Sequence, residues 1–219
     1  MPNRDVRVQA QPAMVTATAY SPSIKIRTHL WILWARIAIK HEAMAQAARN
    51  QAQQPGVDLG PLFEAEMDAS LTGICAAAFA LEALSRELEE LGLLPPATVQ
   101  AWTKNRPSDA AVTLEVLKVA VDPKGMVNHW SQELPWLFKI RGQSVHYEGS
   151  LQAPQPHPLG TNTGPAQVTY SIENTTRAID LLVGILERCR DKPKSGARSW
   201  SQAAQGIITQ LIGSRGQSP

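Results

Sequence analysis

A long apolar stripe with helical spacing lies between residues 62 and 91 and sets the strongest limit on the fold. Its members recur every three or four residues and therefore share one face of a helix: Met67, Leu71, Ile74, Ala78, Leu81, Leu84, Leu88 and Leu91. Small residues fill the middle of the segment, at Ala69, Ser70, Gly73, Ala76, Ala77, Ala78 and Ala80. A second helix can therefore approach it closely, and Gly92 is suited to end it.

A second helical stripe begins near Ile24 and ends at the sequence Gln54-Pro55-Gly56. Its face comprises Leu30, Trp31, Trp34, Ala38, His41, Ala45 and Ala48. The two segments follow each other after a short break, so we expect them to form the central antiparallel pair of a bundle.

Shorter helical patterns follow at 98–104, 108–121, 127–147, 172–190 and 203–212. Ser108 is a candidate N-cap, and the cleaner part of the helix predicted at 127–147 should begin near Pro135. Residues 149–165 are rich in Pro and Gly and predict a long loop. The predicted fold class is all-α, a helical bundle of about five or six helices. A short irregular or strand-like N-terminal arm covers 1–22, the bundle covers 23–191, and 192–219 form a basic linker and a short C-terminal helix.

Composition excludes several classes of protein. Hydrophobic residues make up 43% of the 219 residues and the net charge is +2, which is ordinary for a globular protein without a global basic field. The stretch 30–39 is interrupted by Arg36, so it is too short for a membrane span, and no signal-peptide core follows Arg7. We expect a cytoplasmic protein in which Cys75 and Cys189 are free thiols.

One short motif carries candidate chemistry. Residues 137–147 read Leu-Phe-Lys-Ile-Arg-Gly-Gln-Ser-Val-His-Tyr, so Arg141 and His146 are separated by four residues near the end of a predicted helix. With its place before the last core helix, this motif resembles that of the HEPN superfamily of α-helical domains, over roughly residues 24–190. The resemblance implies RNA cleavage without a metal or cofactor, often by a homodimer whose motifs face each other. It also implies a toxin or defence effector, with an antitoxin or defence component as a protein partner.

The residue types suit that chemistry. A histidine can move protons at neutral pH, and an arginine can hold a developing phosphoryl charge through two parallel hydrogen bonds. Arg141 and His146 are the candidate catalytic residues, while Gln143 and Ser144 would assist orientation. Tyr147 can stack on a base and Glu82 can reach inward to orient Arg141. Five residues correspond to about 140° around an ideal helix, so the two catalytic side chains converge only at a helix end or across a dimer.

A non-catalytic interpretation stands beside this one. Active members usually carry a polar residue where this chain has Gly142, so the motif is also compatible with a degenerate site. Arg141 would then pair with a carboxylate such as Glu82 or Glu148, and His146 would cap the helix. The chain would be a helical dimerisation module or a protein- or nucleotide-binding module.

The remaining candidates have structural alternatives. A basic run can bind phosphate backbones or form a solvated linker: Arg188, Arg190, Lys192, Lys194 and Arg198. The tryptophans at 31, 34, 102, 130 and 136 belong to a core or a dimer interface. The histidines at 29, 41, 129 and 157 lack zinc-ligand spacing with the cysteines.

Overall fold

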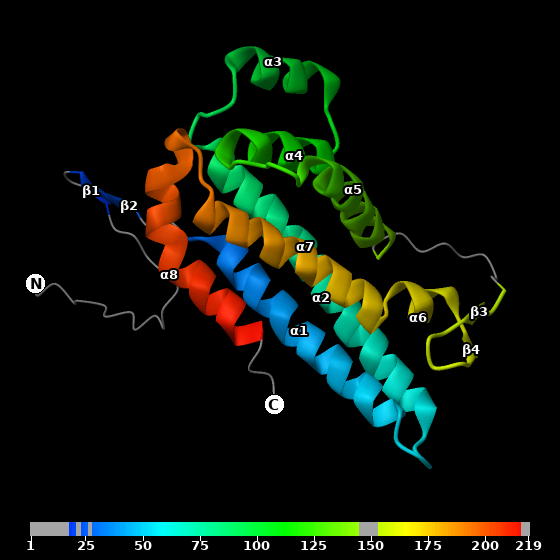
Figure 1. Cartoon of the computed structure of the whole chain (residues 1–219). Helices are drawn as coiled ribbons and strands as arrows, with labels where there is room; N and C mark the ends of the chain where they lie inside the picture. Colours follow the sequence, from blue (N-terminus) through cyan, green and yellow to red (C-terminus); the bar gives the residue numbers. More distant parts are fainter. Residues whose placement is uncertain (1–17, 21–22, 26–27, 145–152, 216–219) are drawn as a thin grey trace, which may run out of the picture.

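The protein is an all-α helical bundle, as the sequence predicts (Figure 1). The computed structural model describes residues 18–20, 23–25, 28–144 and 153–215. Helices α1 (Leu30–Ala52) and α2 (Leu59–Glu89) lie side by side and are joined by a short turn, so they form the expected antiparallel pair. Helix α7 (Ile172–Asp191) packs against both, and α8 (Arg198–Arg215) packs against α1 and α7.

Helices α4 (Asp109–Ala120) and α5 (Val127–Gln143) pack against each other and against α2. Helix α3 (Pro96–Asn105) has no fully buried residue and lies at one end of the molecule (Figure 1). The central helix α2 is thus covered from several sides. Helix α5 is one of the helices that pack against it.

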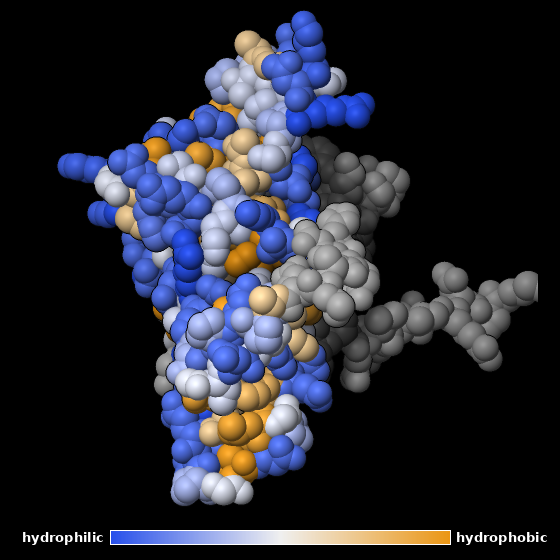
Figure 2. All heavy atoms as spheres, turned by 90° about the vertical axis from the view of Figure 1, so that its right-hand side faces the viewer, coloured by the Kyte–Doolittle hydropathy of each residue, from blue (hydrophilic) through white to orange (hydrophobic). Residues whose placement is uncertain are grey.

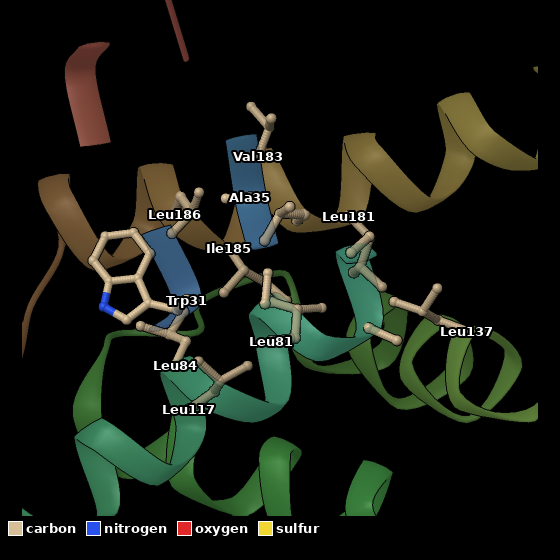
Figure 3. Packing of buried hydrophobic residues seen from close by; sticks show 14 of the residues in the cluster. Trp31, Ala35, Leu81, Leu84, Leu117, Leu137, Leu181, Val183, Ile185 and Leu186 are labelled. Carbon is tan, nitrogen blue, oxygen red and sulfur yellow. The ribbon is translucent and has the colours of Figure 1, made fainter. Parts of the chain in front are cut away.

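The small residues of α2 let its neighbours approach closely, as predicted. Ala77, Ala78 and Ala80 are fully buried, and a Cβ atom built on Gly73 would lie 3.0 Å from Cγ2 of Thr175 and 3.6 Å from the carbonyl oxygen of Ala38. Buried side chains from α1, α2, α4, α5 and α7 pack together in the core, among them Trp31, Leu81, Leu117, Leu137 and Ile185 (Figure 3).

Helix α2 is also long and apolar enough, by length and composition, to cross a membrane. However, 56% of its most apolar stretch is buried inside the bundle, as expected for the core helix of a soluble protein. The face shown in Figure 2 is largely hydrophilic, with hydrophobic residues gathered toward the end where α1 and α2 are joined.

The predicted signals at Ser108 and Gly92 are confirmed, whereas α2 begins at Leu59, three residues before the expected start. The side chain of Asp58 accepts a hydrogen bond from the Gly60 amide at the start of α2. Ser108 caps α4 by accepting from the Ala111 amide. Gly92 ends the turn after α2 with φ of 68°, a conformation that favours glycine.

The start of α1 differs from the prediction. The helix begins at Leu30 instead of Ile24, because residues 23–25 form strand β2 (Ser23–Lys25), which pairs antiparallel with β1 (Thr18–Tyr20). This pair spans the expected boundary at residue 22. Residues 1–17 of the predicted arm lie outside the described residues.

The expectation that α5 becomes regular only near Pro135 is wrong. The helix is continuous from Val127 through Pro135. Both Pro135 and Ser131, whose carbonyl loses its usual helical donor, are exposed, so water can take the place of the missing N–H.

The Pro- and Gly-rich segment contains more structure than a loop. Strands β3 (Gln155–Pro156) and β4 (Asn162–Thr163) pair antiparallel, and α6 (Pro165–Thr169) follows. The expected basic linker includes a 3-10 turn, η1 (Ser195–Ala197), and α8 extends well beyond the predicted 203–212. Pairing of Val121 with Pro193 ties this linker to the end of α4.

Candidate functional site

Arg141 lies in the last turn of α5 and reaches carboxylates on two other helices. Its Nη2 donates to Oε2 of Glu82 on α2 at 3.1 Å and to Oδ2 of Asp109 on α4 at 3.2 Å. The Arg141 side chain is 22% exposed, against 33% for Glu82 and 46% for Asp109. The guanidinium is therefore held in place at the surface, with part of it open to solvent.

Two aromatic rings complete the surroundings of the guanidinium. Its Cζ lies 5.3 Å from the ring centroid of Phe79 and 5.6 Å from that of Phe138. Both distances are within the range of cation–π attraction. The Nε of Arg141 is buried and has no hydrogen-bond partner among the described residues, so one donor of this fixed group is still unused.

The C-terminal end of α5 is fastened by polar contacts. Ser144 Oγ donates to the carbonyl of Arg141 at 2.6 Å and lies 3.3 Å from Sγ of Cys75. The buried hydroxyl of Tyr170 donates to the carbonyl of Ile140, and burial raises the pKa of Tyr170, with Cys75 adding to the shift. Cys75 and Cys189 are both free, as predicted, and burial raises the pKa of Cys189 to about 12.

Gly142 is not required by crowding. A Cβ atom at this position would have no heavy atom of the described residues within 4 Å, and Gly142 is not among the described glycines with positive φ. Gln143 is exposed at the end of the helix. Among the described residues, nothing crowds position 142, so a larger residue would fit where the glycine stands.

The other half of the motif lies outside the described residues. This applies to His146 and Tyr147, and also to Glu148 as the alternative partner of Arg141. The structure brings together Arg141, Glu82 and Ser144 among the predicted site residues, and places Gln143 beside them.

Asp109 is a member of this site that sequence reasoning missed. Asp109 could have been noticed in the sequence as an acidic residue in the first turn of a predicted helix. A carboxylate there is stabilised by the positive end of the helix dipole. The two carboxylates and one guanidinium give the cluster a formal charge of −1. A phosphate would therefore bind Arg141 more readily if it displaced a carboxylate, and Asp109, the more exposed of the two, is the easier one to displace.

A second polar cluster, also missed, joins the far ends of three helices. Arg49 on α1 is 5% exposed and forms two hydrogen bonds with Glu66 on α2, at 2.8 and 2.6 Å. It also donates to Glu173 on α7, and Glu66 accepts from the Ile172 amide. This cluster fixes the start of α7, which is a structural role.

The other candidates have structural surroundings in the described parts of the chain. Trp31 and Trp130 are core residues with 1% and 0% exposure. Arg177 pairs with Glu133 and lies over the ring of Trp136 at 3.9 Å. No group of three or more His, Cys, Asp or Glu side chains suited to a metal ion occurs in the described residues.

Comparison with known proteins leaves the family open: no family model matches the chain, and no curated protein or solved structure matches it.

Proposed function

We propose that this chain is a HEPN-type, metal-independent endoribonuclease that works as a homodimeric, cytoplasmic toxin or defence effector. His146 removes the proton of a ribose 2′-hydroxyl, whose oxygen attacks the adjacent phosphorus. This leaves a 2′,3′-cyclic phosphate and expels the 5′-oxygen of the next nucleotide, which takes up a proton from water and departs as a hydroxyl. Arg141 holds the phosphate charge that develops during the attack.

The position of Arg141 is the observation that supports this proposal most. A guanidinium at a helix end, held by Glu82 and flanked by Phe79 and Phe138, is already oriented before any ligand binds. Such preorganisation is what stabilisation of a transition-state charge requires. Glu82 is then a positioning residue, and departure of Asp109 frees the guanidinium for the phosphate.

The proposed homodimer is supported by an apolar stripe on α1. Leu30, Leu33 and Met44 are 52%, 53% and 47% exposed, and Ile37 lies between them at the spacing of a helix–helix seam. Trp34 on the same side of α1 contacts Phe79 with ring centroids 5.0 Å apart. Pairing along this stripe would bring the Arg141 sites of two copies toward one interface.

A non-catalytic dimerisation or protein-binding module is the second candidate. The observation in its favour is the double carboxylate around Arg141, which already neutralises the guanidinium. In that case the α1 stripe would be the functional surface and the ion pairs would only fasten α5.

The test is incubation of purified protein with mixed cellular RNA in the presence of a chelator. The parent should cleave, while Arg141→Ala and His146→Ala should each lower the rate by at least about a hundredfold, the usual contribution of such groups. Glu82→Gln should lower it less. Arg177→Ala is the matched control and should leave the rate unchanged. Like Arg141, Arg177 forms an ion pair, but it lies on α7.

Circular dichroism of each variant checks that the helical content is preserved. Equal cleavage by the His146→Ala variant would contradict the assigned role of that histidine. If the dimeric parent itself leaves the RNA intact, the binding module becomes the better description.

A further inference from the structure

The basic run that ends α7 lines an open groove between that helix and the first turns of α8 (Figure 1). The groove has a volume of about 460 Å³. Three basic residues line it, Arg190, Lys192 and Arg198, together with two carboxylates, Asp122 and Asp191. These five side chains give the groove a formal charge of +1.

Both carboxylates in the groove already have partners, whereas two of the cations do not. Asp191 accepts two hydrogen bonds from Arg190, at 2.6 and 2.9 Å. Oδ1 of Asp122 accepts from a backbone amide two residues later, at 3.1 Å. Lys192 and Arg198 are exposed, and neither forms an ion pair in the part of the chain that the structure describes. These two cations are therefore the groups that an anion can reach.

The field at this surface is positive. The pKa of the Asp191 carboxyl is lowered, first by its hydrogen bonds from Arg190, and the positive charges of Arg190, Lys192 and Arg188 act in the same direction. The same cations would attract a second anion that enters the groove.

The segment that carries Lys192 is fixed to the end of α4. Its carbonyl accepts from the Asp122 amide at 2.9 Å, and the neighbouring Pro193 pairs with Val121. The Lys194 amide donates to a carbonyl of the last turn of α4, also at 2.9 Å. The basic run is thus a preformed surface, and a ligand does not have to order it.

Polar side chains of α8 extend the groove beyond the cations. Arg198, Gln202 and Gln205 line it, are exposed and recur at helical spacing on one face of α8. Seven residues of a helix correspond to about 10 Å. Arginine and glutamine side chains both donate to the phosphate oxygens of nucleic acids. A row of such donors suits a chain of phosphates better than a single small ion.

We propose that this groove is a second contact surface for RNA and holds the phosphate backbone of the strand on which Arg141 acts. The choice of RNA as the anion rests on the proposed ribonuclease function. Helix α4 links the two sites, because Asp109 in its first turn contacts Arg141 while Val121 after its last turn contacts Pro193. The 12 residues of α4 span about 18 Å, so one strand of several nucleotides can contact both sites.

The test is the binding of a fluorescent RNA about 12 nucleotides long, measured by anisotropy at several salt concentrations. Its riboses carry 2′-O-methyl groups, so it lacks the nucleophilic hydroxyl and cannot be cleaved. The double variant Lys192→Gln/Arg198→Gln should bind about tenfold more weakly than the parent at low salt. The plot of log affinity against log salt should become less steep by about 1.4, since each phosphate contact of a single strand contributes about 0.7.

The matched control is Lys104→Gln/Arg106→Gln. It also removes one exposed lysine and one exposed arginine, but at the end of α3, outside the groove. Affinity and salt dependence should stay as in the parent. A second variant, Lys192→Arg/Arg198→Lys, keeps both charges and should retain the salt dependence of the parent.

Three results would overturn the proposal. Unchanged affinity and salt dependence in the groove variant would leave its two cations to an acidic protein partner or to solvent. An equal loss in the α3 control would mean that binding follows net charge alone. Displacement of the RNA by inorganic phosphate at constant ionic strength would assign the groove to a single small anion.

The outcome is separable from that of the cleavage assay. Because the methylated RNA cannot react, its binding to the groove does not depend on a catalytic role of Arg141 or His146. A parent that leaves natural RNA intact but binds the methylated strand through the groove would refute the ribonuclease and retain the contact surface.

Discussion

His157, in the turn between β3 and β4, shows how a single residue can be fixed by its surroundings. It is 4% exposed, and its ring meets the edge of Phe63 with centroids 4.8 Å apart. The Leu159 amide donates to its Nδ1 at 3.3 Å, so the neutral ring carries its hydrogen on Nε2. Burial lowers the pKa of His157, and the charge of Arg49 lowers it further, while Glu66 and Glu173 act in the opposite direction.

This lowered pKa predicts a pH dependence of stability. The unfolded chain protonates His157 near its ordinary pKa of about 6.5, whereas the folded chain protonates it only at lower pH. The free energy of unfolding should therefore fall as the pH drops from about 6.5 to the pKa in the folded protein, by at most about 1.4 kcal/mol per pH unit. Burial, and then Lys40, also lower the pKa of His41, which adds a decline of the same sign.

The effect is measured by urea unfolding of parent and His157→Asn at pH 7.5 and 5.5. Asparagine can still accept from the amide two residues later, so the turn is retained. The free energy of unfolding should fall less in the variant than in the parent between the two pH values, with a difference of at most about 1.4 kcal/mol. The same substitution at exposed His129 is the control, and an unchanged pH dependence in His157→Asn would refute the assignment.

At the level of helices, the contact between α2 and α7 depends on one glycine. The methyl group of Thr175 would lie 3.0 Å from a Cβ on Gly73, and it has little freedom to move. Thr175 is fully buried and its hydroxyl donates to the Ser171 carbonyl at 2.9 Å. For Gly184 in the middle of α7, such a Cβ would have no heavy atom within 4 Å in the part of the chain that the structure describes.

The two glycines should therefore respond oppositely to alanine. Gly184→Ala should raise the free energy of unfolding by about 0.5–1 kcal/mol, because alanine loses less conformational entropy in a helix. Gly73→Ala should lower it by about 1–3 kcal/mol, because overpacking outweighs that gain. Both values come from urea titrations, and a stabilising Gly73→Ala would show that α2 and α7 are farther apart than described.

For the molecule as a whole, a substitution in the exposed stripe on α1 tests whether the protein is a dimer. Leu33 lies in the middle of the stripe, near Arg36 and Lys40, so Leu33→Arg would place a third positive charge on that face. The parent should sediment as a dimer, and this variant should weaken dimerisation at least about tenfold, since a buried unpaired charge is costly.

Val99→Arg is the matched control for this experiment. Val99 is also an exposed apolar residue, at 40%, but lies on α3, away from the stripe. The Val99→Arg variant should sediment with the same molecular mass as the parent. If the parent sediments as a monomer at tens of micromolar, the proposal of a homodimer is wrong.

Local sequence patterns were enough to predict the main helices and their central pair. Apolar periodicity is a local property, and it identified α1, α2 and α7 because each buries one continuous face. It failed where local signals conflict with packing: Ile24 joined a strand, Pro135 stayed within a helix, and 155–163 formed a hairpin.

Which polar groups meet became known only from the packing of the helices. The pairing of Arg141 with Glu82 could be anticipated, because Glu82 stands at the edge of the α2 stripe. Asp109, 32 residues before Arg141, and the contact of Arg49 with Glu173, 124 residues apart, could not. Burial and partners of a polar side chain depend on how helices pack, and that packing joins residues whose separation in the sequence carries no information about their distance.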